Sequence, residues 1–181
     1  RLAQSAGCDV AGIDVGEFPV EAANRTGAFA MLESGDDTTK AVHEWSRGRG
    51  ADAVLLMAAS SSSAIAARTP ALCRDQANIV VVGDIGLDLD RRPFYERELN
   101  LRFARSYGPG RYERPYEEWG VDYPPGLVRW SEGRNFEAVL DLLASRKLSI
   151  ADLVTHRFPV SDAVSAYNMV EQGKEPTLGI L

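Results

Sequence analysis

Histidine and cysteine are scarce in this sequence of 181 residues. It has two histidines, His43 and His156, and two cysteines, Cys8 and Cys73, each in a separate part of the chain. Small secreted proteins held by disulfides carry a denser set of cysteines, and zinc sites need closely spaced cysteine and histidine ligands. The sequence therefore argues against both classes. We expect no metal ligands in this chain and two buried, structural thiols.

Basic residues are fewer than acidic residues, and long apolar runs are absent. Lysine and arginine number 20 against 26 acidic residues, which gives a net charge of −6 at pH 7 and a pI near 5.0. A nucleic-acid partner would require a basic face. No apolar run approaches the ~20 residues of a membrane helix, and the N-terminus lacks the apolar region of a signal peptide. We predict a cytoplasmic protein with no nucleic-acid partner and no membrane partner.

The dinucleotide-binding fingerprint GxGxxG does not occur in the chain. Gly108 and Gly110 follow a predicted strand, but the residues after them cannot open a helix, so we interpret this pair as part of a loop. The chain starts at Arg1 rather than Met, and RLAQSAG is typical of the last turns of a helix capped by Gly7. We therefore expect the glycine-rich phosphate turn and the first strand of the sheet to lie upstream of this segment.

Apolar strands alternate with helices in the first half of the chain. The patterns predict strands over 8–16, 28–32, 53–59 and 78–86, and helices over 19–27, 38–48 and 62–75. Continuous apolar strands separated by helices are typical of a parallel sheet covered on both faces. The predicted fold class is therefore α/β, a Rossmann-type doubly wound parallel sheet without its first strand and with a C-terminal helical extension. We place the nucleotide-binding domain at 1–147 and the extension at 148–181.

A different pattern begins after residue 86. The stretch LNLRFARSYG alternates apolar and charged residues, as an edge strand with one solvated face does. A long loop rich in proline and aromatic residues follows, and then NFEAVLDLLASRKLS predicts an amphipathic helix. The loop could line a polar substrate pocket or pack against a partner domain, and its aromatic content favours packing. Its candidate residues are Arg105, Tyr107, Arg111, Tyr112, Tyr116, Trp119, Tyr123 and Trp130.

Asp14 ends the first predicted strand and precedes a helix. In a nucleotide-binding βαβ unit, an acidic residue at this place accepts hydrogen bonds from the adenosine ribose hydroxyls. Its charge would repel a 2′-phosphate, and no arginine occurs at 15–18 to reverse that preference. The sequence predicts NAD rather than NADP. The alternative interpretation is a solvated aspartate at a strand end.

Small residues lie at the carboxyl ends of the strands predicted over 53–59 and 78–86. In an open α/β sheet the ligand lies beyond the carboxyl ends of the strands, where small side chains let the backbone approach a flat ring. We expect Gly83 to help the backbone approach the ring, because glycine adopts dihedral angles that other residues resist. Ordinary turn formation is the alternative for each position, and no residue is assigned a catalytic role. The candidate cofactor-binding residues are Asp14, Ala58, Ala59, Ser60, Val82, Gly83 and Asp84.

The order of these features resembles the medium-chain dehydrogenase/reductase superfamily, the zinc-type alcohol dehydrogenases, over nearly the whole chain. The resemblance rests on GCDVAGIDVGEFPVEAANRTGA, GRGADAVLLMAAS, IVVVGDIG and the closing NFEAVLDLLASRKLSIADLVTHRFPVSDAVSAYNMVEQGK. The expanded segment PFYERELNLRFARSYGPGRYERPYEEWGVDYP is similar to a subgroup in which the dehydrogenase part is fused to a second oxidoreductase domain.

The resemblance implies the C-terminal cofactor-binding portion of an NAD-dependent alcohol or polyol dehydrogenase. Asp14 would bind the ribose, while Ala58–Ser60 and Val82–Asp84 would line the nicotinamide. The resemblance implies that the ligands of a catalytic zinc lie mostly in an N-terminal domain that this chain lacks. The chain alone is therefore expected not to turn over substrate. The substrate would be a small alcohol or carbonyl compound. Family dimers pair the last strand of the sheet, which corresponds here to Leu99–Ser106, and an exposed edge is a template for such pairing.

Two other functions fit part of the pattern. A methyltransferase that uses S-adenosylmethionine also places an acidic residue after its second strand. That fold usually ends in an antiparallel hairpin, which the closing THRFPVSDAVSAY does not resemble. The third interpretation is a non-catalytic nucleotide-binding or interaction module.

Overall fold

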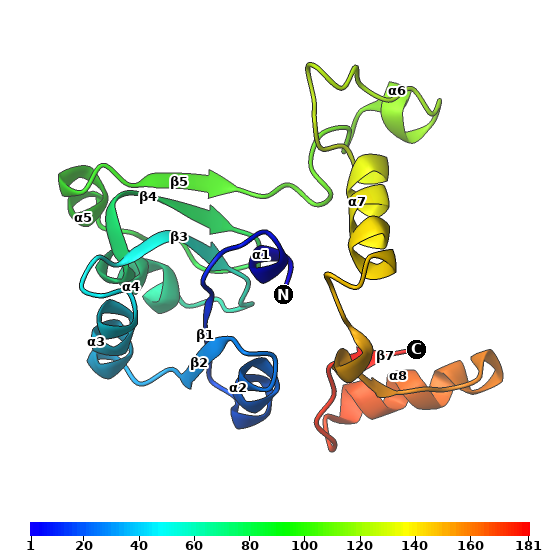
Figure 1. Ribbon diagram of the computed structural model, residues 1–181, viewed down its shortest axis with the longest axis horizontal. Coiled ribbons are helices and arrows are strands. Elements are labelled where there is room, and N and C mark those ends of the chain that lie inside the picture. Colours follow the sequence, from blue (N-terminus) through cyan, green and yellow to red (C-terminus); the bar gives the residue numbers. More distant parts are fainter. The chain divides into compact units, whose positions relative to one another are not determined.

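The structure is a computed structural model that describes residues 1–181, and the chain forms two units. The first unit consists of Arg1–Ser34 and Val139–Leu181, and the second consists of Gly35–Ala138. The helix α7 (Glu132–Ala144) carries the chain from the second unit back to the first (Figure 1). The division into 1–147 and 148–181 remains a prediction from the sequence.

The second unit is built on a sheet of three parallel strands. Its order is β3 (Ala51–Leu56), β4 (Cys73–Val81), β5 (Asn100–Phe103), so each strand lies beside the next one in the sequence. The register aligns Val54 with Ile79 and Ile79 with Leu101. Helix α4 (Ala64–Leu72) connects β3 to β4, and α5 (Arg91–Glu96) precedes β5. Helix α3 (Asp36–Trp45) leads into the sheet and buries Val42.

One face of this sheet holds the core of the unit. Leu56, Ile79 and Val81 project from it and are almost fully buried with Ala66 of α4. Their burial removes apolar surface from water, which is the main favourable term in folding. The continuous apolar pattern of the sequence therefore predicted the parallel strands correctly, and the α/β class is confirmed.

The first unit contains a βαβ element of its own, which is smaller than the sheet of the second unit. Strands β1 (Ala11–Asp14) and β2 (Phe29–Leu32) pair in parallel, with Asp14 beside Leu32, and α2 (Glu17–Asn24) connects them. The Asn24 side-chain amide donates to the Ala30 carbonyl at 3.0 Å and accepts from its N–H at 2.9 Å, which fixes the end of the helix against the strand. The short α1 (Leu2–Ser5) ends before Gly7 at φ +86°.

The remainder of the first unit comes from the C-terminal end of the chain. It contains the short 3₁₀ helices η1 (Ala151–Leu153) and η2 (Val160–Asp162), strand β6 (Val154–His156), helix α8 (Ala163–Gln172) and strand β7 (Gly179–Ile180). Strands β6 and β7 pair in parallel. Arg1 donates to both carboxylate oxygens of Asp152 and so links the N-terminal segment of this unit to its C-terminal segment.

Several predicted boundaries are wrong. The strand expected over 53–59 covers Ala51–Leu56, and the edge strand expected over Leu99–Ser106 covers only Asn100–Phe103. Ser106, which was expected within the strand, takes a left-handed backbone at φ +44°. The helix expected to reach residue 75 ends at Leu72, where β4 begins. Helix α5 was not predicted from the sequence, although Asp90 is an ordinary N-cap whose carboxylate accepts from the Arg92 N–H.

The apolar side chains of the last two long helices are exposed. Phe136 and Leu140 of α7 are 63% and 60% exposed, and Tyr167 of α8 is 77% exposed. No helix in the chain is both long enough and apolar enough to span a membrane. Cys73 is buried as expected, but Cys8 is exposed in the turn after α1, so only one of the two predicted structural thiols is correct.

Candidate functional site

Asp14 is held at the carboxyl end of β1. Its Oδ1 accepts a hydrogen bond from the Gly16 N–H at 2.9 Å, and its carbonyl accepts from the Glu33 N–H at 2.8 Å, so both its side chain and its backbone are fixed. Gly16 is the N-cap of α2, and its extended backbone turns the chain into that helix. Asp14 is exposed, its Oδ2 has no hydrogen bond within the chain, and the next residue, Val15, is 83% exposed.

The residues after β3 and β4 lie against each other. All three strands of the sheet run in parallel, so their carboxyl ends meet at one edge. There the Ser60 N–H donates to the Asp84 carbonyl at 2.8 Å, and the Gly86 N–H donates to the Ser60 carbonyl at 2.9 Å. We call residues 57–63 and 82–86 the turn pair. It brings together six of the seven predicted cofactor-binding residues, Ala58, Ala59, Ser60, Val82, Gly83 and Asp84.

Two glycines allow this close approach. A Cβ on Gly83 would lie 2.0 Å from the Ala58 carbonyl oxygen, and one on Gly86 would lie 2.6 Å from the Ser61 carbonyl oxygen. Neither glycine has a positive φ. The expectation that Gly83 is needed for unusual dihedral angles is therefore wrong, because the constraint is the space that the facing backbone leaves. The result is a turn surface made of backbone, on which Met57 and Val82 are 67% and 47% exposed.

A long connection leaves the carboxyl end of β5, at the same edge of the sheet as the turn pair. We call residues 104–131 the insert. Tyr116 lies at its centre, with its ring centroid 6.2 Å from that of Tyr107 and 6.0 Å from that of Tyr123. Gly110 packs so closely on the Tyr116 ring that a Cβ there would lie 2.5 Å from the ring atoms. The predicted packing of these aromatic residues is thus, in part, packing within the insert itself.

Charged groups close the insert at two points. Glu117 accepts from the Tyr107 hydroxyl and from Arg111 at 2.7 Å, and these two hydrogen bonds lower the pKa of Glu117 to about 2. Donating this hydrogen bond to the Glu117 carboxylate raises the pKa of Tyr107. At the other end, the Arg134 guanidinium pairs with Asp122 at 3.0 Å and donates to two backbone carbonyls, those of Tyr123 and Val128.

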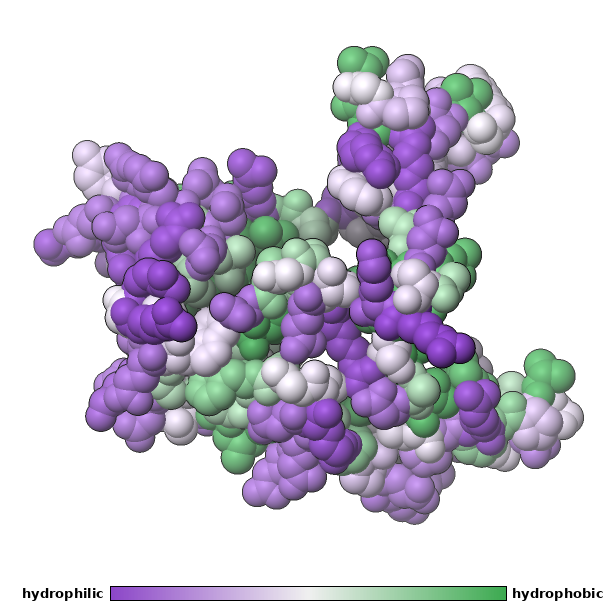
Figure 2. Space-filling model, in the orientation of Figure 1, coloured by the Kyte–Doolittle hydropathy of each residue, from purple (hydrophilic) through white to green (hydrophobic).

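The outer surface of the insert carries arginine side chains stacked on aromatic rings. Arg111 lies 4.4 Å from the Tyr112 ring centroid, and Arg129 lies 4.1 Å from that of Trp130. Figure 2 shows apolar surface over this segment, at the top right of the view, between hydrophilic residues. Tyrosine, tryptophan and arginine are enriched at the centres of protein interfaces, so this surface has the composition of a contact surface.

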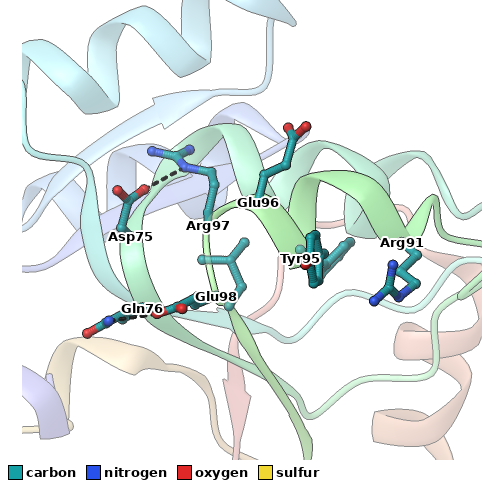
Figure 3. Close-up of a pocket in the computed structure, with 9 residues that line it drawn as sticks. Asp75, Gln76, Arg91, Tyr95, Glu96, Arg97 and Glu98 are labelled. Atoms are coloured by element: carbon teal, nitrogen blue, oxygen red, sulfur yellow. Dashed lines mark hydrogen bonds and ion pairs between the residues drawn. The ribbon is translucent and has the colours of Figure 1, made fainter.

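A cavity of about 720 Å³ opens at the opposite, amino-terminal edge of the same sheet. It is lined by the first residues of β4 and by α5 with the turn that follows it (Figure 3). Arg97 pairs with Asp75 at 3.0 Å, and the Gln76 amide donates to Glu98 at 2.8 Å. This cavity was not predicted from the sequence. Its only sequence signal is the dense run of charges at 96–98.

Neither histidine belongs to a metal site. His43 Nε2 lies 2.8 Å from the Ala71 carbonyl, and His156 Nδ1 lies 2.9 Å from the Thr155 hydroxyl. No group of three or more histidine, cysteine, aspartate or glutamate side chains is arranged to hold a metal ion.

The sequence matches no protein-family model, and a search of curated proteins also found no match. Solved structures match at the level of the fold. The 2R,3R-butanediol dehydrogenase of Bacillus subtilis has a TM-score of 0.74 at 15% identity over 98% of this chain and 44% of its own. An alcohol dehydrogenase of Thermus sp. has a TM-score of 0.71 at 19% identity, over 99% and 45%. An alcohol dehydrogenase of Escherichia coli, solved with NADH, has a TM-score of 0.69 at 18% identity, over 95% and 43%.

These likenesses show that the chain has the fold of one part of the alcohol dehydrogenases. The chain spans less than half of the length of each of these enzymes. This agrees with the resemblance found in the sequence, which covers the nucleotide-binding portion of that class of enzyme. The Rossmann-type fold is thereby confirmed.

Proposed function

We propose that this chain is the NAD-binding portion of an alcohol or polyol dehydrogenase, in which hydride passes between a small alcohol or carbonyl substrate and the nicotinamide. The observation that carries the proposal is Asp14, whose carboxylate is fixed at the carboxyl end of β1 with Oδ2 free. The fold likeness to an alcohol dehydrogenase solved with NADH supports it.

Asp14 has the chemistry to choose between the two nicotinamide cofactors. The Gly16 N–H holds one carboxylate oxygen, so the other is left to accept from a ribose hydroxyl. A 2′-phosphate in the same place would meet a like charge. Residues 15–18 are Val, Gly, Glu and Phe, which offer no cation to a phosphate. The arrangement therefore favours NAD over NADP.

The turn pair would receive the nicotinamide half of the cofactor. Ala58, Ala59 and Ser60 have small side chains, and the facing backbone at Val82–Asp84 is locked to them by hydrogen bonds. The bound nicotinamide would supply the hydride acceptor, while the turn pair would present a fixed surface to its ring. Such a surface loses little entropy on binding because its backbone is already ordered. No residue of this chain is assigned to the proton transfer.

The test measures cofactor affinity, which does not depend on turnover. NADH fluorescence is titrated with the protein, with Asp14→Asn and with Asp14→Ala. Loss of a hydrogen bond to a charged group costs about 1.5–3 kcal/mol, so both variants should raise the Kd for NADH about 10- to 100-fold. The double variant Asp14→Ser with Val15→Arg should shift the preference toward NADPH. Unchanged affinity in all three variants would refute the role of Asp14.

The methyltransferase alternative is disfavoured by the sheet topology. All strand pairings in the chain are parallel, so the antiparallel hairpin expected of that fold does not occur. A titration with S-adenosylhomocysteine separates the two functions. Tight binding of S-adenosylhomocysteine without binding of NADH would overturn the dehydrogenase proposal. NAD binding without activity on a broad panel of alcohols would instead favour the non-catalytic module.

The proposal also includes a homodimer formed through the edge of the sheet. Strand order places β5 at the end of the sheet, with one side unpaired. The predicted edge Leu99–Ser106 is shorter in the structure, Asn100–Phe103, but it is still exposed. Sedimentation velocity of the protein should give the mass of a dimer. A monomer at micromolar concentration would refute this part of the proposal.

A further inference from the structure

Most of the charged side chains around the cavity in Figure 3 are paired within the chain. The Arg97 guanidinium donates to Asp75 at 3.0 Å and to the Pro70 carbonyl at 2.7 Å. The Glu96 carboxylate accepts from Arg92 at 2.7 Å. These contacts leave two charges that line the cavity without an ion pair, one basic and one acidic.

Arg91 is the unpaired base. Its guanidinium lies over the Tyr95 ring, 4.5 Å from the ring centroid, and it has no hydrogen bond or ion pair within the chain. Stacking on the ring holds the guanidinium in place and leaves its N–H groups free. An arginine held in this way is suited to bind a carboxylate through two parallel hydrogen bonds.

Glu98 is the unpaired acid. The Gln76 amide donates to its Oε2 at 2.8 Å, while its Oε1 has no hydrogen bond within the chain. A neutral amide orients the carboxylate but does not compensate its charge. The free oxygen is therefore suited to accept from an ammonium group, which has only donors to offer.

The backbone at Gln76 and Glu98 also indicates that their side chains have a role. Both residues take a left-handed backbone, with φ of +58° and +49°. Glycine adopts this conformation at no steric cost, and it is the usual residue just after a helix such as α5. Residues held in unfavourable backbone conformations concentrate at ligand sites. The chain thus keeps two side chains at the cavity where the turns themselves would favour glycine.

The surface between the two unpaired charges is apolar and aromatic. Phe94 and Leu99 are half-buried and pack against the core of the unit. Tyr95 is 66% exposed and lies between Arg91 and Glu98 (Figure 3). Its ring stacks on the first, and its carbonyl accepts from the N–H of the second at 3.3 Å. An apolar chain laid across this surface would join the two charged ends of the cavity.

We propose that the cavity binds a linear zwitterion, with its ammonium group on Glu98, its apolar middle on Tyr95 and its carboxylate on Arg91. The volume of about 720 Å³ lies in the range of small-molecule sites. This inference does not rest on the proposed function, because the cavity lies at the edge of the sheet opposite the turn pair.

The spacing of the two charges selects the length of the ligand. Seven positions separate Arg91 from Glu98, and a helical rise of ~1.5 Å per residue sets their Cα atoms about 10 Å apart. A di- or tripeptide with free ends spans about 7–10 Å. An ω-amino acid with an apolar chain of similar length carries the same two charges. An α-amino acid holds both charges on one carbon and is too short.

Titration calorimetry of the protein tests the ligand class. The probes are ω-aminohexanoate, leucyl-leucine, leucine, hexylamine and hexanoate. Hexylamine and hexanoate each lack one charge and should bind about tenfold more weakly than ω-aminohexanoate, as should leucine. Tighter binding of leucyl-leucine than of ω-aminohexanoate would support short peptides as the ligand, and the reverse order would support ω-amino acids. Equal affinity for leucine and ω-aminohexanoate would overturn the proposal, as would the absence of binding by both longer zwitterions.

Two variants assign the two ends of the ligand. Arg91→Met should raise the Kd for ω-aminohexanoate about tenfold and leave that for hexylamine unchanged, because hexylamine has no carboxylate. Glu98→Gln should raise the Kd for ω-aminohexanoate by a similar factor and leave that for hexanoate unchanged. The unchanged affinity for the ligand with a single charge also shows that each variant is folded.

The Arg92–Glu96 pair supplies the matched controls. Arg92→Met and Glu96→Gln remove charges of the same sign from the same helix, but these charges already have a partner in the chain. Both controls should keep the Kd for ω-aminohexanoate within about twofold of the wild type. Losses as large in the controls as in Arg91→Met and Glu98→Gln would overturn the proposal, and so would wild-type affinity in both of those variants.

Discussion

The turn pair and the insert follow the carboxyl ends of neighbouring strands, but they are held in different ways. The turn pair is fixed by backbone hydrogen bonds, such as that from the Ser60 N–H to the Asp84 carbonyl, and by two glycines without room for a side chain. The insert is fixed by side chains, with the Tyr116 ring at its centre and the Arg134 guanidinium closing one end.

The difference determines what each segment tolerates. The backbone fixes the turn pair, so many side chains are tolerated on its outer surface. A Cβ added at Gly83 or Gly86 is not tolerated, because the facing backbone carbonyls cannot move away without disrupting the sheet. Side chains fix the insert, so it has few close backbone contacts of this kind. It depends instead on particular functional groups of those side chains. Substitutions at glycine should therefore damage the turn pair, and substitutions of polar groups should damage the insert.

Gly83→Ala should have the largest effect. Its Cβ would lie 2.0 Å from the Ala58 carbonyl oxygen, so β3 and β4 would have to separate at their ends. We expect the free energy of unfolding to fall by about 3 kcal/mol, measured by urea denaturation. Gly126→Ala is the control, because no atom lies within 4 Å of a Cβ built there. Equal stability of the two variants would mean that the turn pair is not constrained by space.

Arg134→Met should come next. It removes the ion pair with Asp122 and the hydrogen bonds to the Tyr123 and Val128 carbonyls, while keeping most of the aliphatic volume. We expect a loss of about 2 kcal/mol and faster tryptic cleavage within the insert. Arg129→Met removes only a surface contact with Trp130 and should change stability by less than about 0.5 kcal/mol. Cleavage at the wild-type rate in Arg134→Met would contradict a side-chain-determined insert.

Glu117→Gln should change how the insert responds to acid. The hydrogen bonds from Tyr107 and Arg111 lower the folded-state pKa of Glu117 from 4.5 to about 2. A lowered pKa stabilises the folded state above pH 4.5, and that stabilisation is lost as the pH falls toward 2. The fluorescence of Trp119 should therefore report a transition of the insert in this window in the wild type, and a weaker one in the variant. Glu118→Gln should keep the wild-type curve, and identical curves for Glu117→Gln would refute the assignment.

Ser63→Ala should have the smallest effect. The Ser63 hydroxyl accepts from the Asp88 N–H at 2.9 Å, which is one of the few side-chain contacts near the turn pair. We expect a loss of about 0.5 kcal/mol in urea denaturation. Ser61→Ala removes no hydrogen bond of the hydroxyl and should be neutral. A loss comparable to that of Gly83→Ala would show that side chains matter as much as backbone in the turn pair.

Elements with a strong apolar pattern could be predicted from the sequence. The alternation of strands and helices correctly predicted parallel pairing within each unit, of β1 with β2 and of β3, β4 and β5 in turn. In β3 and β4 the signal was the continuous apolar runs that hold the core residues Leu56, Ile79 and Val81. The position of Asp14 at a strand end was also predicted correctly. Its role in binding NAD stays a prediction.

Other features depend on contacts distant in the sequence and could not be predicted. The true start of β4 depends on the pairing of Cys73 with Ala51, which no local pattern indicates. Glycine is required at position 83 because the Ala58 carbonyl faces it and leaves no room for a Cβ. The cavity at the amino-terminal edge of the sheet depends on the contact between Gln76 and Glu98. In each case the determining partner lies more than 20 positions away along the chain.

The contrast between the two thiols gives the protein a natural labelling site. Burial raises the pKa of the Cys73 thiol to about 11, so this thiol stays protonated and unreactive at neutral pH, while Cys8 is exposed. A maleimide dye would therefore attach at Cys8 alone, a few residues before the strand that ends in Asp14. Energy transfer from NADH to a dye at this position would report the arrival of the cofactor without any substitution in the chain.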